Sequence, residues 1–221
     1  MPNYVKNRLI IPNDRAAEVL AFVNGEDTLI DFNKIVPMPE SLNCEDSSTG
    51  DEGMQYLLLG DSPFKTIERA QIKERLEQHG YFEQAIALGK IYLKNIAETG
   101  HKTWYSWGID NWGTKWNAME ASVKVQGDET CLEFDTAWGG VILLMEKLSA
   151  HFPDIPFIYK YADEDTGSNC GYGVIVNGLA SMTFPEQRSR EAYDLAFELR
   201  PEYAENYELK DGNYVYKEEE E

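Results

Sequence analysis

The stretch from Trp104 to Asn117 constrains the fold of this chain more than any other. It holds four of the five tryptophans of a 221-residue chain within fourteen residues. Large aromatic rings are most stable when they are buried against other apolar groups. The first interpretation is therefore structural: the four rings pack against a sheet and helices, and the polar residues between them form turns. The rings are Trp104, Trp107, Trp112 and Trp116, and the turn residues are Asn111, Gly113 and Asn117.

The same stretch supports a functional interpretation, in which some of the rings line a cleft. Together with a lysine and side-chain amides, such rings could stack on a base, a peptide side chain or a protein partner. Both interpretations stay open, because they can hold for different residues. The candidates for partner or ligand binding are Trp107, Asn111, Trp112, Lys115, Trp116 and Asn117, together with the acidic turn Asp163, Glu164 and Asp165.

Hydrophobic spacing on either side of this stretch predicts two halves with the order strand, helix, strand. The first half comprises a strand over 4–11, a helix over 16–23 and a strand over 29–36. The second half comprises a hairpin over 121–136, a helix over 141–148 and strands over 157–162 and 171–177. Two such halves that share one antiparallel sheet, with helices on one face, form an α+β fold of the ferredoxin-like type.

Residues 41–103 interrupt this pattern and are predicted to be an insertion. Residues 41–53 have no hydrophobic period and are interpreted as an exposed, mobile loop, and residues 62–98 as a helical hairpin that begins at Ser62 and Pro63. Thr183 and Glu186 have the spacing of a capping box and predict a C-terminal helix, followed by a solvated run over 218–221. The predicted domains are 1–40 and 104–178 for the two halves of the ferredoxin-like domain, 41–103 for the loop and helical insertion, and 179–221 for the C-terminal helix and acidic tail.

The charge limits the kinds of partner that we expect. There are 39 acidic and 20 basic residues, and the formal net charge is −19. Nonspecific nucleic-acid binding needs a basic face, so we expect no direct contact with nucleic acid. The simplest interpretation of the acidity is solubility, and the alternative is attraction to a basic protein surface, including one that normally holds nucleic acid. The chain has no apolar run that could cross a membrane, and three scattered cysteines argue against a disulfide framework. These features predict a cytoplasmic protein.

No set of residues in the sequence spells out a reaction. The segment Gly108 to Lys115 approaches a phosphate-binding loop, but its last two residues are reversed and its tryptophans would obstruct the anion. Asp163, Asp165 and Gly167 lack the further oxygen ligands of a calcium loop. The three histidines are widely separated and lack metal-binding spacing. We therefore expect no cofactor and no metal, and a non-enzymatic role is favoured while enzymatic activity stays open.

Five segments, taken together and in this order, resemble the YubB-type ferredoxin-like family, the Api-type proteins carried by phages, plasmids and genomic islands of bacteria. The resemblance covers most of residues 1–178 and implies a ferredoxin-like fold and a mobile-element origin, without iron–sulfur chemistry. It implies nothing for the part beyond Ser181. The segments are Met1–Arg8, Asp31–Glu40, Asn111–Ala118, Phe134–Trp138 and Tyr161–Asp165.

The implied origin, the charge and the missing catalytic pattern together predict an accessory protein of a phage or mobile element. Its expected partner is a protein of the bacterial host, and we expect inhibition of a nucleic-acid-handling defence complex such as a CRISPR effector. The alternative is a binding protein or enzyme for a small, nucleotide-like ligand in the tryptophan-rich cleft. A third interpretation is an assembly module that acts as an oligomer. The sequence leaves the oligomeric state open.

Overall fold

The computed structural model describes residues 3–60, 62 and 64–217, and the chain divides into two compact units. The sheet unit comprises residues 1–37 and 110–221, and the helical unit comprises residues 38–109. The predicted solvated run at 218–221 and the predicted helix position Pro63 lie outside the described residues.

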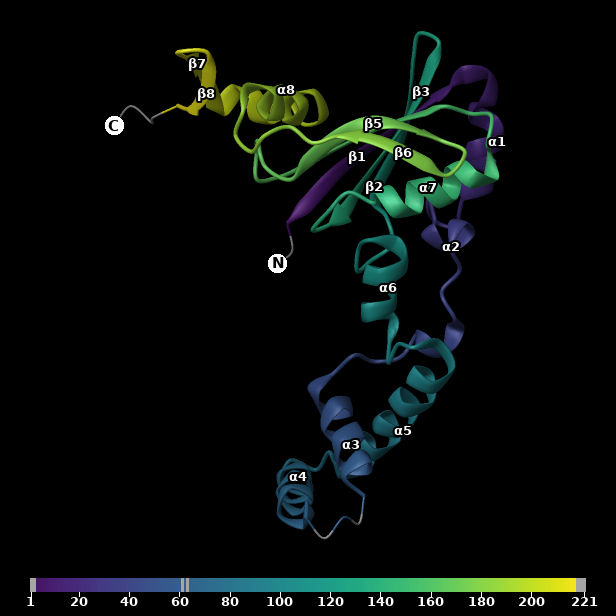
Figure 1. Cartoon of the computed structure of the whole chain (residues 1–221), viewed down its shortest axis with the longest axis vertical. Coiled ribbons are helices and arrows are strands. Elements are labelled where there is room, and N and C mark those ends of the chain that lie inside the picture. The colour runs from purple at the N-terminus through teal and green to yellow at the C-terminus, as the bar shows by residue number, and fades with distance from the viewer. Residues whose placement is uncertain (1–2, 61, 63, 218–221) are drawn as a thin grey trace. The chain divides into compact units, whose positions relative to one another are not determined.

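The sheet unit is built on six antiparallel strands in the order β2-β3-β1-β4-β5-β6 (Figure 1). Apart from the helices between α1 (Asn13–Val23) and β2, the chain order is β1, α1, β2, β3, α7 (Ile142–His151), β4, which is the βαββαβ order of the ferredoxin-like fold. These four strands have the spatial order 4-1-3-2, and this confirms the predicted α+β, ferredoxin-like fold. The additional strands β5 and β6 extend the sheet beyond β4. The strands are β1 (Tyr4–Pro12), β2 (Met119–Gln126), β3 (Glu129–Ala137), β4 (Phe157–Asp163), β5 (Cys170–Val176) and β6 (Leu179–Thr183).

Alternation along the strands gives the sheet two different faces. On β1, Val5, Leu9 and Ile11 are fully buried on one face, where α1 and α7 pack. Figure 1 shows α7 on one side of the sheet and α8 (Arg190–Leu199) on the other. Helices were expected on one face only, so α8 adds a third layer.

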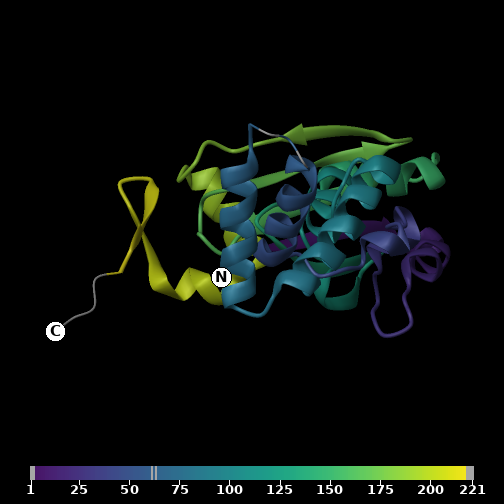
Figure 2. The ribbon, with the colours of Figure 1, turned by 90° about the horizontal axis from the view of Figure 1, so that it is seen from below.

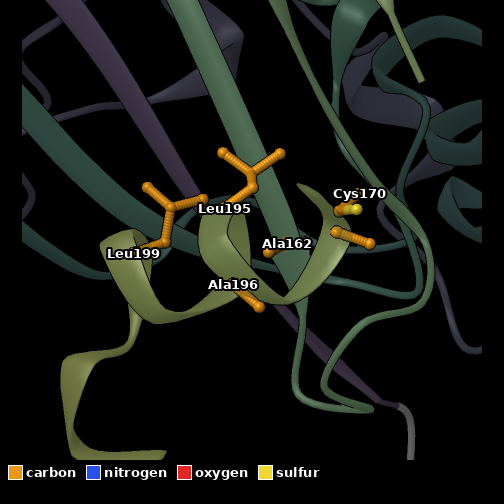
Figure 3. Close-up of a cluster of buried hydrophobic side chains, with 6 residues drawn as sticks. Ala162, Cys170, Leu195, Ala196 and Leu199 are labelled. Carbon is orange, nitrogen blue, oxygen red and sulfur yellow. The ribbon is translucent and has the colours of Figure 1, made fainter. Parts of the chain in front are cut away.

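Helix α8 attaches to its face of the sheet through a small apolar cluster. Its Leu195, Ala196 and Leu199 lie against Ala162 of β4 and Cys170 of β5 (Figure 3). Small side chains at these positions let the helix approach the strands closely. The third layer therefore depends on packing as well as on charge.

Ion pairs continue this attachment across the sheet. Glu198 of α8 accepts hydrogen bonds from Arg8 at 3.1 Å and from Lys160 at 2.7 Å, and Arg8 also donates to Glu133 at 2.8 Å. Burial acts to raise the pKa of Glu133, but the hydrogen bonds from Lys124 and Arg8 outweigh it, so that the pKa lies below its usual value. Glu133 is thereby held in its charged form between Lys124 of β2 and Arg8 of β1.

The C-terminal segment ends in a two-stranded hairpin beyond α8. It follows a 3-10 helix, and Figure 2 shows it projecting past the sheet. A cluster of aromatic rings joins the hairpin to α8, with 5.3 Å between the ring centroids of Tyr193 and Tyr207 and 5.0 Å between those of Phe197 and Tyr214. This hairpin was not predicted from the sequence, because each strand is only four residues long. The elements are η2 (Pro201–Asn206), β7 (Tyr207–Lys210) and β8 (Asn213–Tyr216).

The helical unit contains three longer helices, of which α3 and α5 lie side by side (Figure 1). Backbone meets backbone at their crossing: a Cβ added at Gly53 would lie 1.8 Å from the carbonyl oxygen of Ala85, and one at Gly89 would lie 2.5 Å from the carbonyl carbon of Gly53. The unit therefore depends on glycine at these positions. Its elements are η1 (Glu40–Leu42), α3 (Ser48–Leu59), α4 (Thr66–Gln78), α5 (Phe82–Thr99) and most of α6 (Trp104–Trp112).

Two predicted segments have a different structure, and in each case tertiary contacts explain why. The expected mobile loop over 41–53 is wrong at residues 41–42, which lie in η1 with Leu42 fully buried. It is also wrong from Ser48 onward, because Gly50 and Gly53 serve close helix packing rather than turns. The expected strand over 29–36 is wrong because Asp31 accepts a hydrogen bond from the Asn33 backbone at 2.9 Å and thereby starts the short helix α2 (Phe32–Ile35).

Helix starts were also misplaced. The C-terminal helix begins at Arg190 with Ser189 as its cap, whereas Thr183 ends β6, so the capping box at Thr183 is wrong. Helix α4 begins at Thr66, not near Ser62. Among the described residues, no helix is long and apolar enough to cross a membrane.

Candidate functional site

Trp138, the residue after β3, is the most exposed tryptophan and the centre of the candidate site. Its side chain is 43% exposed, and its backbone has a φ of +72°. A bulky residue rarely adopts this left-handed conformation, which costs about 1–2 kcal/mol. Two hydrogen bonds hold it in place: the Trp138 amide donates to the Asn3 carbonyl at 2.9 Å, and the Trp138 carbonyl accepts from the Asn169 side chain at 2.9 Å. An exposed ring is thus fixed on a strained backbone.

Thr114 brings a second segment to the same place. Its hydroxyl donates to the Ala137 carbonyl at 2.9 Å and accepts from the Ala137 amide at 3.2 Å, and the residue is only 1% exposed. These two bonds tie the chain after α6 to the end of β3. As a consequence, Lys115 is placed beside Trp138.

Lys115 lies between two tryptophan rings. Its Nζ is 3.7 Å from the ring centroid of Trp116 and 4.4 Å from that of Trp138. A lysine over an indole face is attracted by the electron-rich ring, by about 0.5–1 kcal/mol at an exposed site. We call Lys115, Trp116 and Trp138 the tryptophan clamp. Of the three, Trp138 is exposed and Lys115 and Trp116 are half-buried.

The loop after Trp138 is anchored from the core. The Val141 amide donates to the hydroxyl of Tyr159 at 2.8 Å, and this hydroxyl donates to the side chain of Asn7 at 2.5 Å. Burial raises the pKa of Tyr159, so that its hydroxyl stays protonated and can donate. Thr136 adds a hydrogen bond from its hydroxyl to the Gly139 carbonyl at 2.7 Å. The loop that follows Trp138 is therefore fixed by hydrogen bonds at Gly139 and Val141.

A cleft of about 550 Å³ lies beside the clamp, at the end of the sheet where β1 begins and β4 ends. Asp163, which is 4% exposed, lines it and accepts hydrogen bonds from Asn3 at 3.0 Å and from Asn169 at 2.7 Å. Because Asn169 also holds the carbonyl of Trp138, the cleft and the clamp share one hydrogen-bond network. We call this space the Asp163 cleft.

Residues 111–219 match the model of a family described as a ferredoxin-like domain in Api92-like protein. This segment belongs to that family. The resemblance to Api-type ferredoxin-like proteins is thereby confirmed over the part of the sheet unit that follows the insertion, including the tryptophan clamp and Asp163. The chain is also similar to the crystal structure of a protein api92 from Yersinia pseudotuberculosis, with 13% identity over 84% of this chain and 99% of that chain and a TM-score of 0.42. No curated protein matches the sequence.

Of the candidates predicted from the tryptophan stretch, Lys115 and Trp116 lie in the clamp, whereas the others have structural contacts. Trp107 and Trp112 are 6% and 5% exposed, and the indole nitrogen of Trp112 donates to the Val36 carbonyl at 2.9 Å. Both residues lie in helix α6, which continues through Asn111, so the expected turn at Asn111 is wrong; the Asn111 carbonyl accepts from Lys147 at 3.4 Å. Buried rings of this kind belong to the core interpretation.

Asn117 links the two chain segments that flank the insertion within the sheet unit. Its side-chain nitrogen donates to Asp31 at 2.7 Å, and its side-chain oxygen accepts from the backbone amides of Phe32 and Ala118 at 2.9 Å each. Three of the four hydrogen-bonding positions of its side chain are thus used within the fold. The geometry assigns Asn117 a structural contact rather than a contact with a ligand.

The acidic turn after β4 divides in the same way. Asp163 lines the cleft, whereas the Glu164 backbone amide donates to the Tyr4 carbonyl at 2.9 Å and Asp165 accepts from the Ser168 hydroxyl at 2.7 Å. Glu164 and Asp165 therefore shape the turn that holds Asp163. In the described part of the ferredoxin-like domain, as in the rest of the described chain, no three His, Cys, Asp or Glu side chains converge as a metal site would require.

Four site residues were not predicted from the sequence: Trp138, Thr114, Asn3 and Asn169. Trp138 ends the resemblance segment 134–138, which was a usable signal, but its left-handed backbone and the bridge through Asn169 arise only from the fold. The cysteines offer no reactive alternative, because burial raises the pKa of Cys44, Cys131 and Cys170. Their thiols stay protonated at neutral pH and are poor nucleophiles.

Proposed function

We propose that this chain is a non-enzymatic accessory protein of a phage or mobile element that binds a host protein in the bacterial cytoplasm. The partner would be a nucleic-acid-handling defence complex, such as a CRISPR effector, and binding would inhibit it. The tryptophan clamp would form the contact. The observation that supports this most is Trp138, which combines a 43% exposed ring with a strained backbone conformation that is tied on both sides.

The geometry suits a binding surface for two reasons. A tryptophan whose backbone is already fixed loses little conformational entropy when a partner covers its ring, and tryptophan is among the residues most enriched at interface hot spots. Lys115 already packs on the rings of Trp116 and Trp138, so a partner that covers Trp138 meets a lysine whose position two rings support. Both features favour recognition of a preformed protein surface.

The charge of the chain supports the choice of partner. A net charge of −19 repels nucleic acid but attracts a basic groove that normally holds it. Electrostatic attraction of this kind raises the rate of encounter and weakens steeply with salt, whereas aromatic contacts do not. The two contributions can therefore be separated by varying the ionic strength.

The test is affinity purification from a bacterial host with three forms of the chain: the wild type, Trp138→Ala and Leu179→Ala. Leu179 is 72% exposed on β6 and serves as a control for the loss of an exposed apolar side chain. We expect a host protein that is captured by the wild type and by Leu179→Ala but is lost with Trp138→Ala, and we expect expression of the chain to weaken the defence system. Capture of the same proteins by all three forms, with defence unaffected, would contradict the proposal.

The alternative, a nucleotide-like ligand in a tryptophan-lined cleft, receives less support from the geometry. Trp107 and Trp112 are buried, so they offer no face for stacking. Thermal unfolding with nucleotides separates the two functions, because a ligand present at one hundred times its Kd adds about 2.7 kcal/mol of stability. A large nucleotide-dependent shift, without any protein partner, would favour the alternative.

A further inference from the structure

Asp163 is a buried carboxylate that forms no ion pair with a basic side chain of the described residues. It is 4% exposed, and its three hydrogen bonds come from neutral groups: the side chains of Asn3 and Asn169 and the backbone amide of Asp165. None of the ion pairs among the described residues includes it. Burying a charge is costly unless an opposite charge or sufficient hydrogen bonds compensate it. Within the described residues, Asp163 is therefore held by neutral donors alone at the wall of a cleft.

The carboxylate still has room for one more donor. A carboxylate accepts about four hydrogen bonds, and three are present here, two on Oδ1 and one on Oδ2. A hard cation such as Ca²⁺ would need six to eight oxygen ligands, whereas here two asparagine side chains direct N–H groups at the carboxylate. The arrangement thus suits an N–H donor that carries a positive charge rather than a metal ion.

Aromatic side chains complete the cleft. Phe184 lies on its rim with 60% of its side chain exposed, and Tyr161 lines its wall. Gly171 allows the two rings to approach the strand, since a Cβ at this position would lie 2.9 Å from Tyr161 and 3.0 Å from Phe184. A planar cation is attracted both by a carboxylate and by an aromatic face.

We propose that the Asp163 cleft binds a basic side chain of the protein partner, an arginine or a lysine, next to the tryptophan clamp. The proposal rests on the proposed function, because the partner supplies the side chain. The cleft volume of about 550 Å³ falls within the usual range of 300–1,000 Å³ for small-ligand sites and easily accommodates such a side chain. The negative charge of the chain as a whole favours the same kind of partner.

The cleft can be tested without the partner, by titrating the full chain with small probes. The probe is n-butylguanidinium, which imitates an arginine side chain, and n-butylurea is its neutral counterpart of nearly the same shape. We expect the ¹H–¹⁵N NMR signals of Asp165 and Asn169 to shift in a saturable way with the guanidinium and not with the urea. A third titration, with n-butylammonium, tells whether the cleft prefers arginine or lysine; saturable binding of either cation supports the proposal.

Variants add a second criterion. Phe184→Ala removes an exposed ring and should weaken binding of the guanidinium by roughly two- to thirty-fold, the range that one cation–π contact contributes. Leu179→Ala is the matched control, because Leu179 is an exposed apolar residue at the far end of β6, the strand that Phe184 follows. It should bind the guanidinium like the wild type. Asp163→Asn should abolish the preference for the cation over the urea.

Equal shifts with guanidinium and urea, or unchanged binding by Phe184→Ala, would overturn the assignment of the cleft. Shifts of the same signals by Ca²⁺ alone would also overturn it. The proposed function is tested separately by the loss of partner capture in Trp138→Ala. A chain that captures its partner through Trp138 but ignores both cations would refute the cleft and leave the proposed function standing.

Discussion

Replacing Thr114 by valine tests how the site is assembled, because two hydrogen bonds of Thr114 tie the segment after α6 to the end of β3. Valine has nearly the same shape but lacks the hydroxyl, so both hydrogen bonds to Ala137 are lost. Two hydrogen bonds contribute about 1–3 kcal/mol, and a buried amide left without a partner adds to the loss, so we expect the sheet unit to lose about 2–4 kcal/mol. The midpoint of thermal unfolding should fall by about 4–16 °C.

Thr114→Ser is the matched control, because serine keeps the hydroxyl and loses only a methyl group, worth about 0.8 kcal/mol. Urea unfolding followed by near-UV circular dichroism measures the free energy of unfolding of each form. The clamp should also loosen in Thr114→Val, so that the indole signals of Trp116 and Trp138 move toward those of free tryptophan in NMR spectra. A valine variant as stable as the serine variant, with unchanged indole signals, would refute the described role of Thr114.

Three further changes test other parts of the structure. Gly53→Ala should destabilise the α3–α5 crossing by at least about 1–3 kcal/mol, because the new methyl group would meet the Ala85 carbonyl at 1.8 Å. Hydrogen exchange in α3 and α5 measures this loss, and Gly139→Ala is the control because the space around Gly139 is open. Asn117→Ala removes three hydrogen bonds. The start of α2 should therefore lose protection from hydrogen exchange, and the free energy of unfolding of the sheet unit should fall by about 2–4 kcal/mol. Unchanged protection would contradict this. The pKa of Glu133 is lower in the folded chain than in the unfolded chain, so the unfolded chain binds the proton more readily. The stability that Glu133 contributes is therefore complete above the usual pKa near 4.5 and is lost as the pH falls through the lower folded pKa. Urea unfolding at several pH values should show a smaller loss of stability in acid for Glu133→Gln than for the wild type, and equal slopes would contradict the assignment.

The elements that could be predicted from the sequence are those whose pattern is local. The hairpin of β2 and β3 has a Gly127-Asp128 turn between alternating strands, and α7 has apolar residues at helical spacing; both lie where the pattern predicts them. These elements supported the ferredoxin-like fold class, although the first half was predicted with a strand over 29–36 where the structure has helix α2. Local periodicity thus carried most of the sheet unit.

The failures occur where contacts distant in sequence decide the structure. Residues 29–36 have the composition of a strand, but the distant side chain of Asn117 holds the Asp31 segment as a helix start. Gly50 and Gly53 suggest turns in isolation, yet they are the positions where α3 meets α5. Neither outcome follows from spacing along the chain, because the partner lies more than 30 residues away.

The candidate site was predictable in part. Lys115, Trp116 and Asp163 were named from sequence, since they lie in the tryptophan stretch and the acidic turn. Trp138 was not, because neither its exposure nor its left-handed backbone can be inferred from its neighbours. The abundance of tryptophan was a correct signal for the region, but it does not distinguish the buried rings from the exposed ones.

The affinity of the captured host protein for wild type, Trp138→Ala and Trp138→Gly is the most direct test of the central claim. Glycine relieves the strain at φ +72°, so Trp138→Gly should be about 1 kcal/mol more stable than Trp138→Ala. The two variants therefore differ in stability, but both lack the indole ring. If the ring is a hot spot, both variants should bind at least about thirty-fold more weakly than the wild type, to a similar extent. Wild-type affinity in Trp138→Gly would contradict the claim that this surface binds the partner.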